Sequence, residues 1–324
     1  MVDPTTVDRI LGYAVRAPSV HNTQPWRWQV GDHQVLLRAD LTRRLSSADP
    51  DGRDLVISCG AALHHFAEAA RALGWRATVH RCPRPEDEWL LAAVDLAPGR
   101  PPSDAPQILD AIVDRRTDRR RLTSWPVPPD RLDSLCAAGS RWGAEVRAVT
   151  DETRRAELER LTRRAEELQS RDPAYEAELA TSTTYWSPSG VPVTHVPRAA
   201  GPAGSAAPDQ RFRHGVLDDP ELERDAPGDE LLLVTTSSDD TLSRLRAGEA
   251  LSAVWLHATR ERMSLVPLSQ AIEVPETRAL VQREVLDDRA VAQLVLRVGW
   301  PALSRRMLPS TPRRDVDEVR VRGL

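Results

Sequence analysis

The chain has 324 residues and a formal net charge of −4 at pH 7, enough sequence for roughly two domains and a sizeable buried core. All 44 basic residues are arginine, since lysine is absent. This composition excludes Schiff-base and pyridoxal chemistry, and also a phosphate loop that needs lysine. Because arginines are spread among acids, we expect no general binding to nucleic acid or to an anionic membrane.

The cysteines and the distribution of apolar residues indicate in which cellular compartment the protein resides. Cys59, Cys82 and Cys136 are single and form no C-x-x-C pair, which favours a reducing compartment over a disulfide framework. The first ten residues carry acids and no apolar run, and no stretch approaches 18 uninterrupted apolar residues. We therefore expect a cytoplasmic protein without secretion or membrane insertion.

The first hundred residues alternate between helical and strand patterns. Apolar residues at helical spacing predict a helix over 5–17, which Pro18 ends. We then expect two strands joined by a short turn, a long amphipathic helix and two further strands, at 26–30, 34–38, 54–74, 76–81 and 88–95. This half is predicted to be α+β.

A proline-rich stretch at 97–106 suits neither a helix nor a central strand. We place a boundary there, which gives halves 1–100 and 101–324. In the second half we expect a helix from Gln107, a long charged helix at about 151–170 and a buried strand at 230–235. Residues 186–229 are rich in proline and glycine and lack a sustained period, which predicts a surface loop or lid that contributes no core.

Two segments resemble each other within the chain. Gly60-Ala-Ala-Leu63 and Gly248-Glu-Ala-Leu251 each open an alanine-rich amphipathic helix that leads into a strand-like run. Two similar units suggest a fused dimer, whereas shared alanine content explains the likeness equally well. The motifs have to decide between these two explanations.

The most specific motif is Ala17-Pro-Ser-Val-His-Asn-Thr-Gln-Pro-Trp-Arg-Trp28. A helix is cut by proline, several polar groups share one bend, and Gln-Pro-Trp leads into a strand. A plain capped turn with a core tryptophan is the alternative. The segment resembles the A-P-S-x-x-N-x-Q-P-W loop of the nitroreductase superfamily and especially its Acg branch. The resemblance implies that this loop holds the FMN phosphate and ribityl chain, through Pro18, Ser19, His21, Asn22 and Gln24.

A second motif, Ala111-Ile-Val-Asp-Arg-Arg-Thr-Asp-Arg-Arg-Arg-Leu122, precedes a Pro-Val-Pro turn. Paired guanidinium groups with a hydroxyl between them suit a terminal phosphate, although an arginine run is usually a solvated helix end. It is similar to the A-I-x-x-R-R-S-x-R-x-F segment of nitroreductases, with threonine for serine and Leu122 near the usual aromatic residue. By that resemblance the phosphate ligands are Arg115, Arg116, Thr117 and Arg119.

The order of the two motifs is informative. In a free-standing nitroreductase the arginine motif precedes the A-P-S loop, whereas here each occurs once and in reverse order. Where a second A-P-S loop is expected, the chain has Ala137-Ala-Gly-Ser-Arg-Trp-Gly143, a degenerate copy. We therefore predict the nitroreductase fold, with mixed and antiparallel sheets flanked by helices, as a single-chain pseudo-dimer with one flavin site. The chain itself would be monomeric or a homodimer.

Further segments extend the resemblance along the chain. Residues 246–255 are similar to the family's G-x-A-L helix, 265–278 to a segment specific to Acg proteins, 294–301 to the strand ending in G-Y-P, and 311–319 to the terminal pattern. The resemblance implies that Pro267, Leu268, Ser269 and Gln270 line the reactive edge of the flavin. It also makes Arg313 or Arg314 a second phosphate anchor.

Other constellations carry less weight. His64-His65 and His80-x-Cys82 lack a second Cys or His at metal-ligand spacing, so we expect no metal. Ser19 and His21 lack the G-x-S-x-G elbow and an acid partner, and no Rossmann fingerprint occurs.

The resemblance implies an FMN-dependent oxidoreductase. NAD(P)H would dock transiently, reduce FMN and be replaced by a nitroaromatic, quinone or similar small-molecule substrate, and no catalytic side chain is required. Alternatively, the lid blocks exchange and the protein stores flavin without turnover, or the chain is a scaffold that binds none. As a lid, 186–229 would bring Arg211, Arg213 and His214 to the cofactor; otherwise it is a remote linker.

Overall fold

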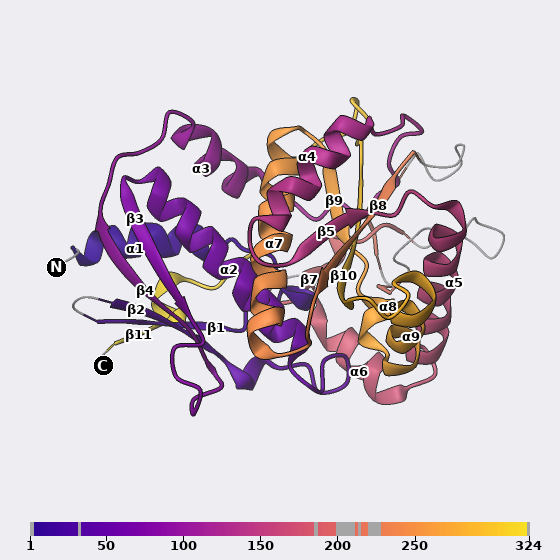
Figure 1. Ribbon diagram of the computed structural model, residues 1–324, viewed down its shortest axis with the longest axis horizontal. Helices are drawn as coiled ribbons and strands as arrows, with labels where there is room; N and C mark the ends of the chain where they lie inside the picture. Colours follow the sequence, from indigo (N-terminus) through magenta and orange to yellow (C-terminus); the bar gives the residue numbers. More distant parts are fainter. Residues whose placement is uncertain are drawn as a thin grey trace.

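The computed structural model describes residues 3–31, 34–184, 187–198, 211–212, 215–219 and 228–322. Two β-sheets stand on either side of a pair of long central helices, α2 (Arg53–Ala72) and α7 (Thr241–Arg260) (Figure 1). The predicted α+β class, with mixed and antiparallel sheets flanked by helices, is confirmed. None of the helices in the described ranges is long and apolar enough to cross a membrane.

The first half closely follows the expected element order. Its helices and strands are α1 (Pro4–Ala14), β1 (Trp26–Val30), β2 (Gln34–Ala39), α2, β3 (Trp75–Arg81) and β4 (Leu90–Pro98). Pro4 starts α1 at a position where its missing N–H costs nothing. Along the sheet the order is β1-β2-β4-β3, and each neighbouring pair is antiparallel.

The second half has the same plan. It consists of α4 (Pro129–Ser140), β5 (Glu145–Ala148), β8 (Glu230–Thr236), α7, β9 (Ser264–Pro267) and β10 (Val291–Gly299). Its sheet order is β5-β8-β10-β9, again antiparallel throughout. Each element of the first half therefore has a counterpart in the second, at the same place in its sheet.

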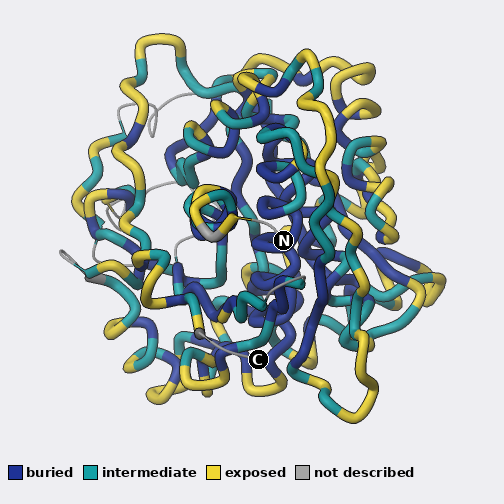
Figure 2. Tube along the Cα trace, turned by 90° about the vertical axis from the view of Figure 1, so that its left-hand side faces the viewer, coloured by how far each residue is buried: buried dark blue, intermediate teal, exposed yellow. Residues whose placement is uncertain are grey.

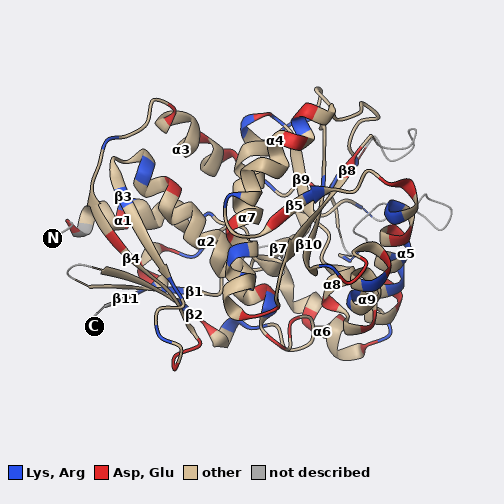
Figure 3. Ribbon diagram, in the orientation of Figure 1, with Lys and Arg blue, Asp and Glu red and all other residues tan. Residues whose placement is uncertain are grey.

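Between β5 and β8 the second half carries additional structure. This consists of α5 (Glu152–Gln169), α6 (Pro173–Ser182) and the short parallel pair β6 (Thr183–Thr184) and β7 (Val191–Pro192). The exposed face of α5 mixes arginines and glutamates, as Figure 3 shows. After β9 come α8 (Gln270–Glu273) and α9 (Pro275–Leu280).

Two elements join the halves. Helix α3 (Ala105–Asp114) follows the predicted boundary but packs Ile108 and Ile112 into the apolar core of the first half. The tail, α10 (Val316–Val319) and β11 (Arg320–Arg322), returns to the first half, where β11 pairs in parallel with β1 and makes that sheet mixed. In Figure 2 the buried trace runs through the interior, and exposed residues line the outer loops.

The crossing of α2 and α7 depends on two glycines. A Cβ on Gly60 would lie 2.1 Å from the Leu245 carbonyl oxygen, and one on Gly248 would lie 1.9 Å from the Ile57 carbonyl oxygen. The contact is reciprocal, because Leu245 precedes Gly248 by the same three residues that separate Ile57 from Gly60. Reciprocity of this kind is the mark of a two-fold interface. Both glycines lie inside their helices rather than at the openings that the sequence suggested.

The structure differs from the sequence expectations at two places. Ala137–Ser140, interpreted from the sequence as part of a degenerate loop, form the last turn of α4, and residues 141–144 connect α4 to β5. Strand β5 was not expected. The segment 186–229 was predicted to contribute no core, yet Val191, Val196 and Phe212 are buried in one apolar cluster. They pack on Tyr175 of α6 and neighbouring side chains, because α6 supplies a surface that the periodicity of the segment does not reveal.

Candidate functional site

A pocket lies between the two halves, where the motif loop faces the second half. It encloses about 890 Å³ when the space of its open mouth is counted. In the first half, its walls come from the loop after α1 and the first turns of α2. In the second half, they come from the segment after α3, residues 191–195 and 211–212, α7, β9 and its following loop, β10 and the tail. The lining side chains are Pro18, Ser19, Val20, His21, Asn22, Asp54, Ile57, Ser58, Thr117, Arg119, Val191, Pro192, His195, Arg211, Phe212, Leu251, Trp255, Pro267, Ser269, Leu294, Thr311 and Arg313.

The motif loop has an unusual backbone. His21, Asn22 and Gln24 have φ angles of 43°, 55° and 52°, which non-glycine residues adopt rarely and at a cost of about 1–3 kcal/mol each. Hydrogen bonds hold this conformation: Ser58 Oγ accepts from Val20 N at 3.0 Å, and Ser19 Oγ accepts from Gln24 N at 3.0 Å. Strain maintained by neighbouring structure is typical of functional sites.

Gln24 joins the motif loop to two distant segments. Its Nε2 donates to the Pro188 carbonyl at 2.6 Å, and its Oε1 accepts from the Arg314 N–H at 2.8 Å. Arg314 also donates to the Gln24 carbonyl and to the Glu318 carbonyl. Gln24 and Arg314 were predicted as flavin contacts, but the structure places both behind the pocket wall, where they position the loop.

His21 and Arg211 form a clasp across the pocket. Arg211 Nη1 lies 2.9 Å from His21 Nε2, and Arg211 Nη2 reaches Glu273 at 2.9 Å and Ser269 Oγ at 3.2 Å. Burial and the charges of Arg211 and Arg119 lower the pKa of His21 well below its ordinary value, so the ring is neutral. Since arginine only donates, Nε2 accepts and the ring proton lies on Nδ1.

Buried polar atoms without partners occur in the walls of this pocket. Within the described residues, His21 Nδ1, Asn22 Oδ1 and Arg313 Nε have no hydrogen-bond partner. The Asn22 amide is held by its Nδ2, which donates to the carbonyls of Gly190 and Pro312 at 2.9 and 3.2 Å. Orphaned groups of this kind are costly. The imidazole N–H of His21, the amide oxygen of Asn22 and the Nε–H of Arg313 therefore remain for a polar ligand, while the Nη atoms of Arg313 donate to backbone carbonyls.

Arginines crowd the end of the pocket near the tail. Burial, followed by the charges of Arg16 and Arg116, lowers the pKa of Arg313 to about 9. The pKa of Arg115 is lowered by burial and by Arg313, and two of its nitrogens have no partner among the described residues. Like charges held together in this way favour an anion. Arg313 lines the pocket, whereas Arg115 stacks over Trp255 at 4.7 Å behind the wall.

Arg116 also lies outside the pocket lining. It donates to the carbonyls of Leu308 and Val113 and so fastens the tail to the end of α3. Thr117 and Arg119 do line the pocket, and Arg119 lies over the ring of Phe212 at 4.9 Å. The arginine motif therefore contains both residues that face the pocket and residues that support it, because adjacent side chains cannot all point the same way.

The loop after β9 contributes in part. Pro267 and Ser269 line the pocket, and Ser269 Oγ donates to Glu273 at 2.6 Å. Leu268 is buried, and its N–H donates to the Val295 carbonyl at 2.8 Å. Gln270 Nε2 donates to Glu166 at 3.2 Å. Leu268 and Gln270 were predicted to line the reactive edge of the flavin, and their side chains lie outside the pocket lining.

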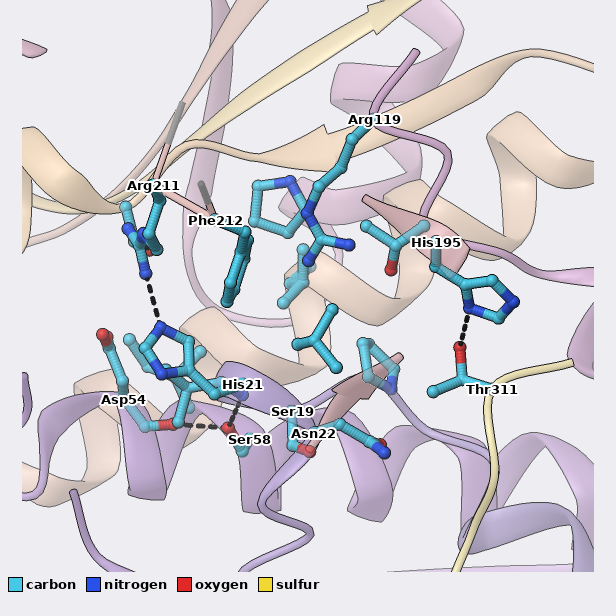
Figure 4. A pocket seen from close by; sticks show the side chains of 18 of the residues that line it. Ser19, His21, Asn22, Asp54, Ser58, Arg119, His195, Arg211, Phe212 and Thr311 are labelled. Carbon is cyan, nitrogen blue, oxygen red and sulfur yellow. Dashed lines mark hydrogen bonds between the residues drawn. The ribbon is translucent and has the colours of Figure 1, made fainter. Parts of the chain in front are cut away.

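Figure 4 shows that the pocket has two unlike ends. Asp54, His21 and Arg211 gather at one end, with Phe212 above His21, and His195 and Thr311 lie at the other. Arg119 stands between the two ends, and Asn22 lies beside Ser19 on the opposite wall.

The predicted residues that line the pocket are Pro18, Ser19, His21, Asn22, Thr117, Arg119, Pro267, Ser269 and Arg313; Gln24, Arg115, Arg116, Leu268, Gln270 and Arg314 support it from behind. Arg211, expected of a lid, lines the pocket too. Arg213 and His214 lie outside the described residues.

Sequence reasoning missed several lining residues. Asp54 and Ser58 lie one turn apart at the start of α2, a polar pair on an otherwise apolar face that could have been noticed. Phe212 and His195 lie in a segment without periodicity, so nothing local indicated them. Trp255 lies in the helix that resembles the family's G-x-A-L segment, but the resemblance did not indicate it as a pocket residue.

The other constellations have structural roles. His64 and His65 both bind Ser252 Oγ through Nδ1, at 2.7 and 2.8 Å, and His80 pairs with Asp95. Among the residues that the structure describes, no three His, Cys, Asp or Glu side chains gather as metal ligands. Ser19 and His21 are each engaged elsewhere, with Gln24 and Arg211, and do not pair as nucleophile and base.

These features define an α+β protein of two similar halves with a pocket lined by polar and charged side chains between them. The chain is similar to "Putative NAD(P)H nitroreductase Rv3131" of Mycobacterium tuberculosis, 39% identical over 98% of this chain and 91% of that protein. It is similar also to "Putative NAD(P)H nitroreductase acg" of the same organism, 33% identical over 98% and 96%. The chain belongs to this nitroreductase family, as the motifs predicted.

Two further comparisons complete the picture. No family model matches the chain. A nitroreductase with bound FMN from Bacteroides fragilis covers 64% of this chain and 95% of its own, with a TM-score of 0.42 and 16% identity.

Proposed function

We propose that this protein is an FMN-dependent oxidoreductase that passes electrons from NAD(P)H to a nitroaromatic, quinone or similar small acceptor. Family membership supports the reaction class, because the relatives are named NAD(P)H nitroreductases. The observation that best supports FMN as the cofactor is the set of buried atoms without a hydrogen-bond partner in the pocket wall, His21 Nδ1, Asn22 Oδ1 and Arg313 Nε.

The lining residues suit the three parts of FMN. The positive charge and free Nε–H of Arg313, together with the hydroxyls of Thr117 and Thr311, suit a phosphate at one end. Asn22 offers a carbonyl oxygen that a ribityl hydroxyl can satisfy, and Trp255 adds apolar surface for a flat ring. Bound FMN would supply hydride transfer, and the chain would orient it and limit access.

We propose one flavin site per chain, in a pseudo-dimer with halves 1–100 and 101–324. Ser58, which supports the motif loop, is the sixth residue of α2, and its counterpart in α7 is Arg246. Arg246 packs on Gly143, where a Cβ would come within 2.8 Å of its Cδ. The counterpart of the motif loop is thus short and filled, which supports a single site.

A second function is favoured by one feature of the pocket, the cap formed by Arg211 and Phe212. Arg211 is held by His21, Ser269 and Glu273, and Phe212 lies edge-on to His21 with ring centroids 5.4 Å apart. A cap fixed in this way would exclude a nicotinamide ring, and the protein would then store flavin with little turnover.

The visible spectrum under anaerobic conditions separates the two functions. The oxidoreductase predicts that the purified yellow protein is bleached by NADH or NADPH within minutes and that a quinone or nitroaromatic restores the colour. The flavin store predicts a yellow protein that dithionite bleaches but NAD(P)H does not. A colourless protein that refuses added FMN would overturn both and leave the scaffold interpretation.

A further inference from the structure

One carboxyl group lines the pocket, and the proposed function does not use it. Asp54 is the second residue of α2, and its side chain lies at the end where His21 and Arg211 meet (Figure 4). It is only 6% exposed, and its ion pair with Arg53 is long at 3.8 Å. Arg53 instead places Nη2 on Gln293 Oε1 at 2.6 Å.

The groups around Asp54 disfavour its charge. Asp49 lies beneath it and accepts the N–H groups of Asp54 and Leu55, and Glu273 faces it from α8. Burial comes first, and the negative charges of Asp49 and Glu273 follow; together they raise the pKa of Asp54 to about 8. The opposing charges are those of Arg53 and Arg211, and Arg211 is already paired with Glu273.

The surrounding charges act in the same direction. Three carboxyls, Asp49, Asp54 and Glu273, share the guanidiniums of Arg53 and Arg211, and Arg53 also pairs with Asp239 at 3.5 Å. The neighbouring His21 is neutral, so negative charge exceeds the positive charge that faces Asp54. Asp54 is the carboxyl that lines the pocket together with His21 and Arg211, so its proton lies where a ligand can reach it.

We propose that Asp54 is a catalytic proton donor: its carboxyl protonates the electron acceptor while reduced flavin delivers hydride. This role rests on the proposed function. With a quinone, hydride reaches one carbonyl oxygen and the Asp54 proton reaches the other, so hydroquinone forms and flavin is reoxidised. The carboxylate left on Asp54 then regains a proton from water. Reduction of flavin by NAD(P)H transfers hydride alone and makes no use of this proton.

The first test needs neither flavin nor activity. In the FMN-free chain labelled with ¹³C at aspartate Cγ, NMR titration should show one carboxyl with a midpoint near pH 8. It should persist in Asp51→Asn, which removes an exposed carboxyl three residues earlier, and vanish in Asp54→Asn. If no aspartate titrates above about pH 6, the proposal is overturned.

The second test separates the two halves of the reaction. In stopped flow, Asp54→Asn should slow reoxidation of the reduced flavoprotein by a quinone roughly 100-fold, the scale of general acid catalysis, and slow reduction by NADPH far less. Above about pH 8 the wild-type reoxidation rate should fall and that of Asp54→Asn should not. Equal effects on both steps would overturn the role.

Failure of the proposed function can be told apart from failure of the role proposed for Asp54. If NADPH does not reduce the wild-type flavoprotein, the proposed function fails, and dithionite then supplies the reduced flavin for the same reoxidation test. The role of Asp54 as proton donor stands only if Asp54→Asn still slows reoxidation of the dithionite-reduced flavin by the quinone.

Discussion

Replacing Gly248 with alanine should damage both the fold and the pocket. The new Cβ would lie 1.9 Å from the Ile57 carbonyl oxygen, so α2 and α7 have to move apart by roughly 1 Å to reach the 3.0 Å of real contacts. Alanine gains up to about 1 kcal/mol of helix propensity, but overpacking a close-packed core costs about 1–3 kcal/mol and more against rigid backbone. We expect a net loss of about 2 kcal/mol.

Thermal unfolding measures this prediction. In a chain of this length, a loss of about 2 kcal/mol corresponds to a Tm lowered by roughly 3 °C. Asp54 and Ile57 on α2 and Leu251 and Trp255 on α7 line the pocket, so FMN affinity should fall as well. Gly12→Ala in α1 is the matched control, because its Cβ meets nothing within 4 Å among the described residues, and it should raise Tm slightly. A Gly248→Ala protein as stable as the wild type would refute the helix crossing.

Three further predictions concern the pocket. Arg313→Ala should weaken FMN binding by about 1.5–3 kcal/mol without unfolding the chain, whereas Arg314→Ala, which breaks the Gln24 contacts, should lower Tm more than it lowers FMN affinity. Fluorescence titration measures the affinity and calorimetry the Tm of each variant, and the opposite pattern would contradict the assignment. Phe212→Ala should speed exchange of bound FMN and admit larger acceptors, measured with excess competing flavin, and unchanged exchange would argue against a cap. Because the pKa of Asp54 is raised on folding, the wild type should lose stability relative to Asp54→Asn as pH rises from about 4 to about 8. The loss should be on the order of 2–5 kcal/mol. Urea denaturation at several pH values measures it, and an equal pH dependence of the unfolding free energy in the two proteins would contradict the prediction.

The fold was accessible from sequence where local patterns are strong. Periodicity predicted α1, α2, β1 to β4 and β8, and two motifs predicted the loop and arginines that meet at the pocket. Strand β5 was missed because its four residues, Glu145–Ala148, are too few to show alternation and stand between charged segments.

The division between lining and supporting residues was not accessible. Arg313 and Arg314 are adjacent in sequence and chemically identical, and only the path of the tail decides that Arg313 faces the pocket while Arg314 binds Gln24. The role of Asp54 depends on Glu273, which lies 219 positions away in the chain. Electrostatic neighbours of this kind come together only after folding.

An equilibrium titration of the FMN-free chain with FMN shows whether the pocket is a single flavin site. We expect saturation at one FMN per chain. Affinity should be reduced in Arg313→Ala and Asn22→Ala and unchanged in Arg141→Ala, which alters the counterpart loop of the other half. Absence of FMN binding, saturation at two FMN per chain, or equal loss of affinity in Arg141→Ala would contradict this expectation.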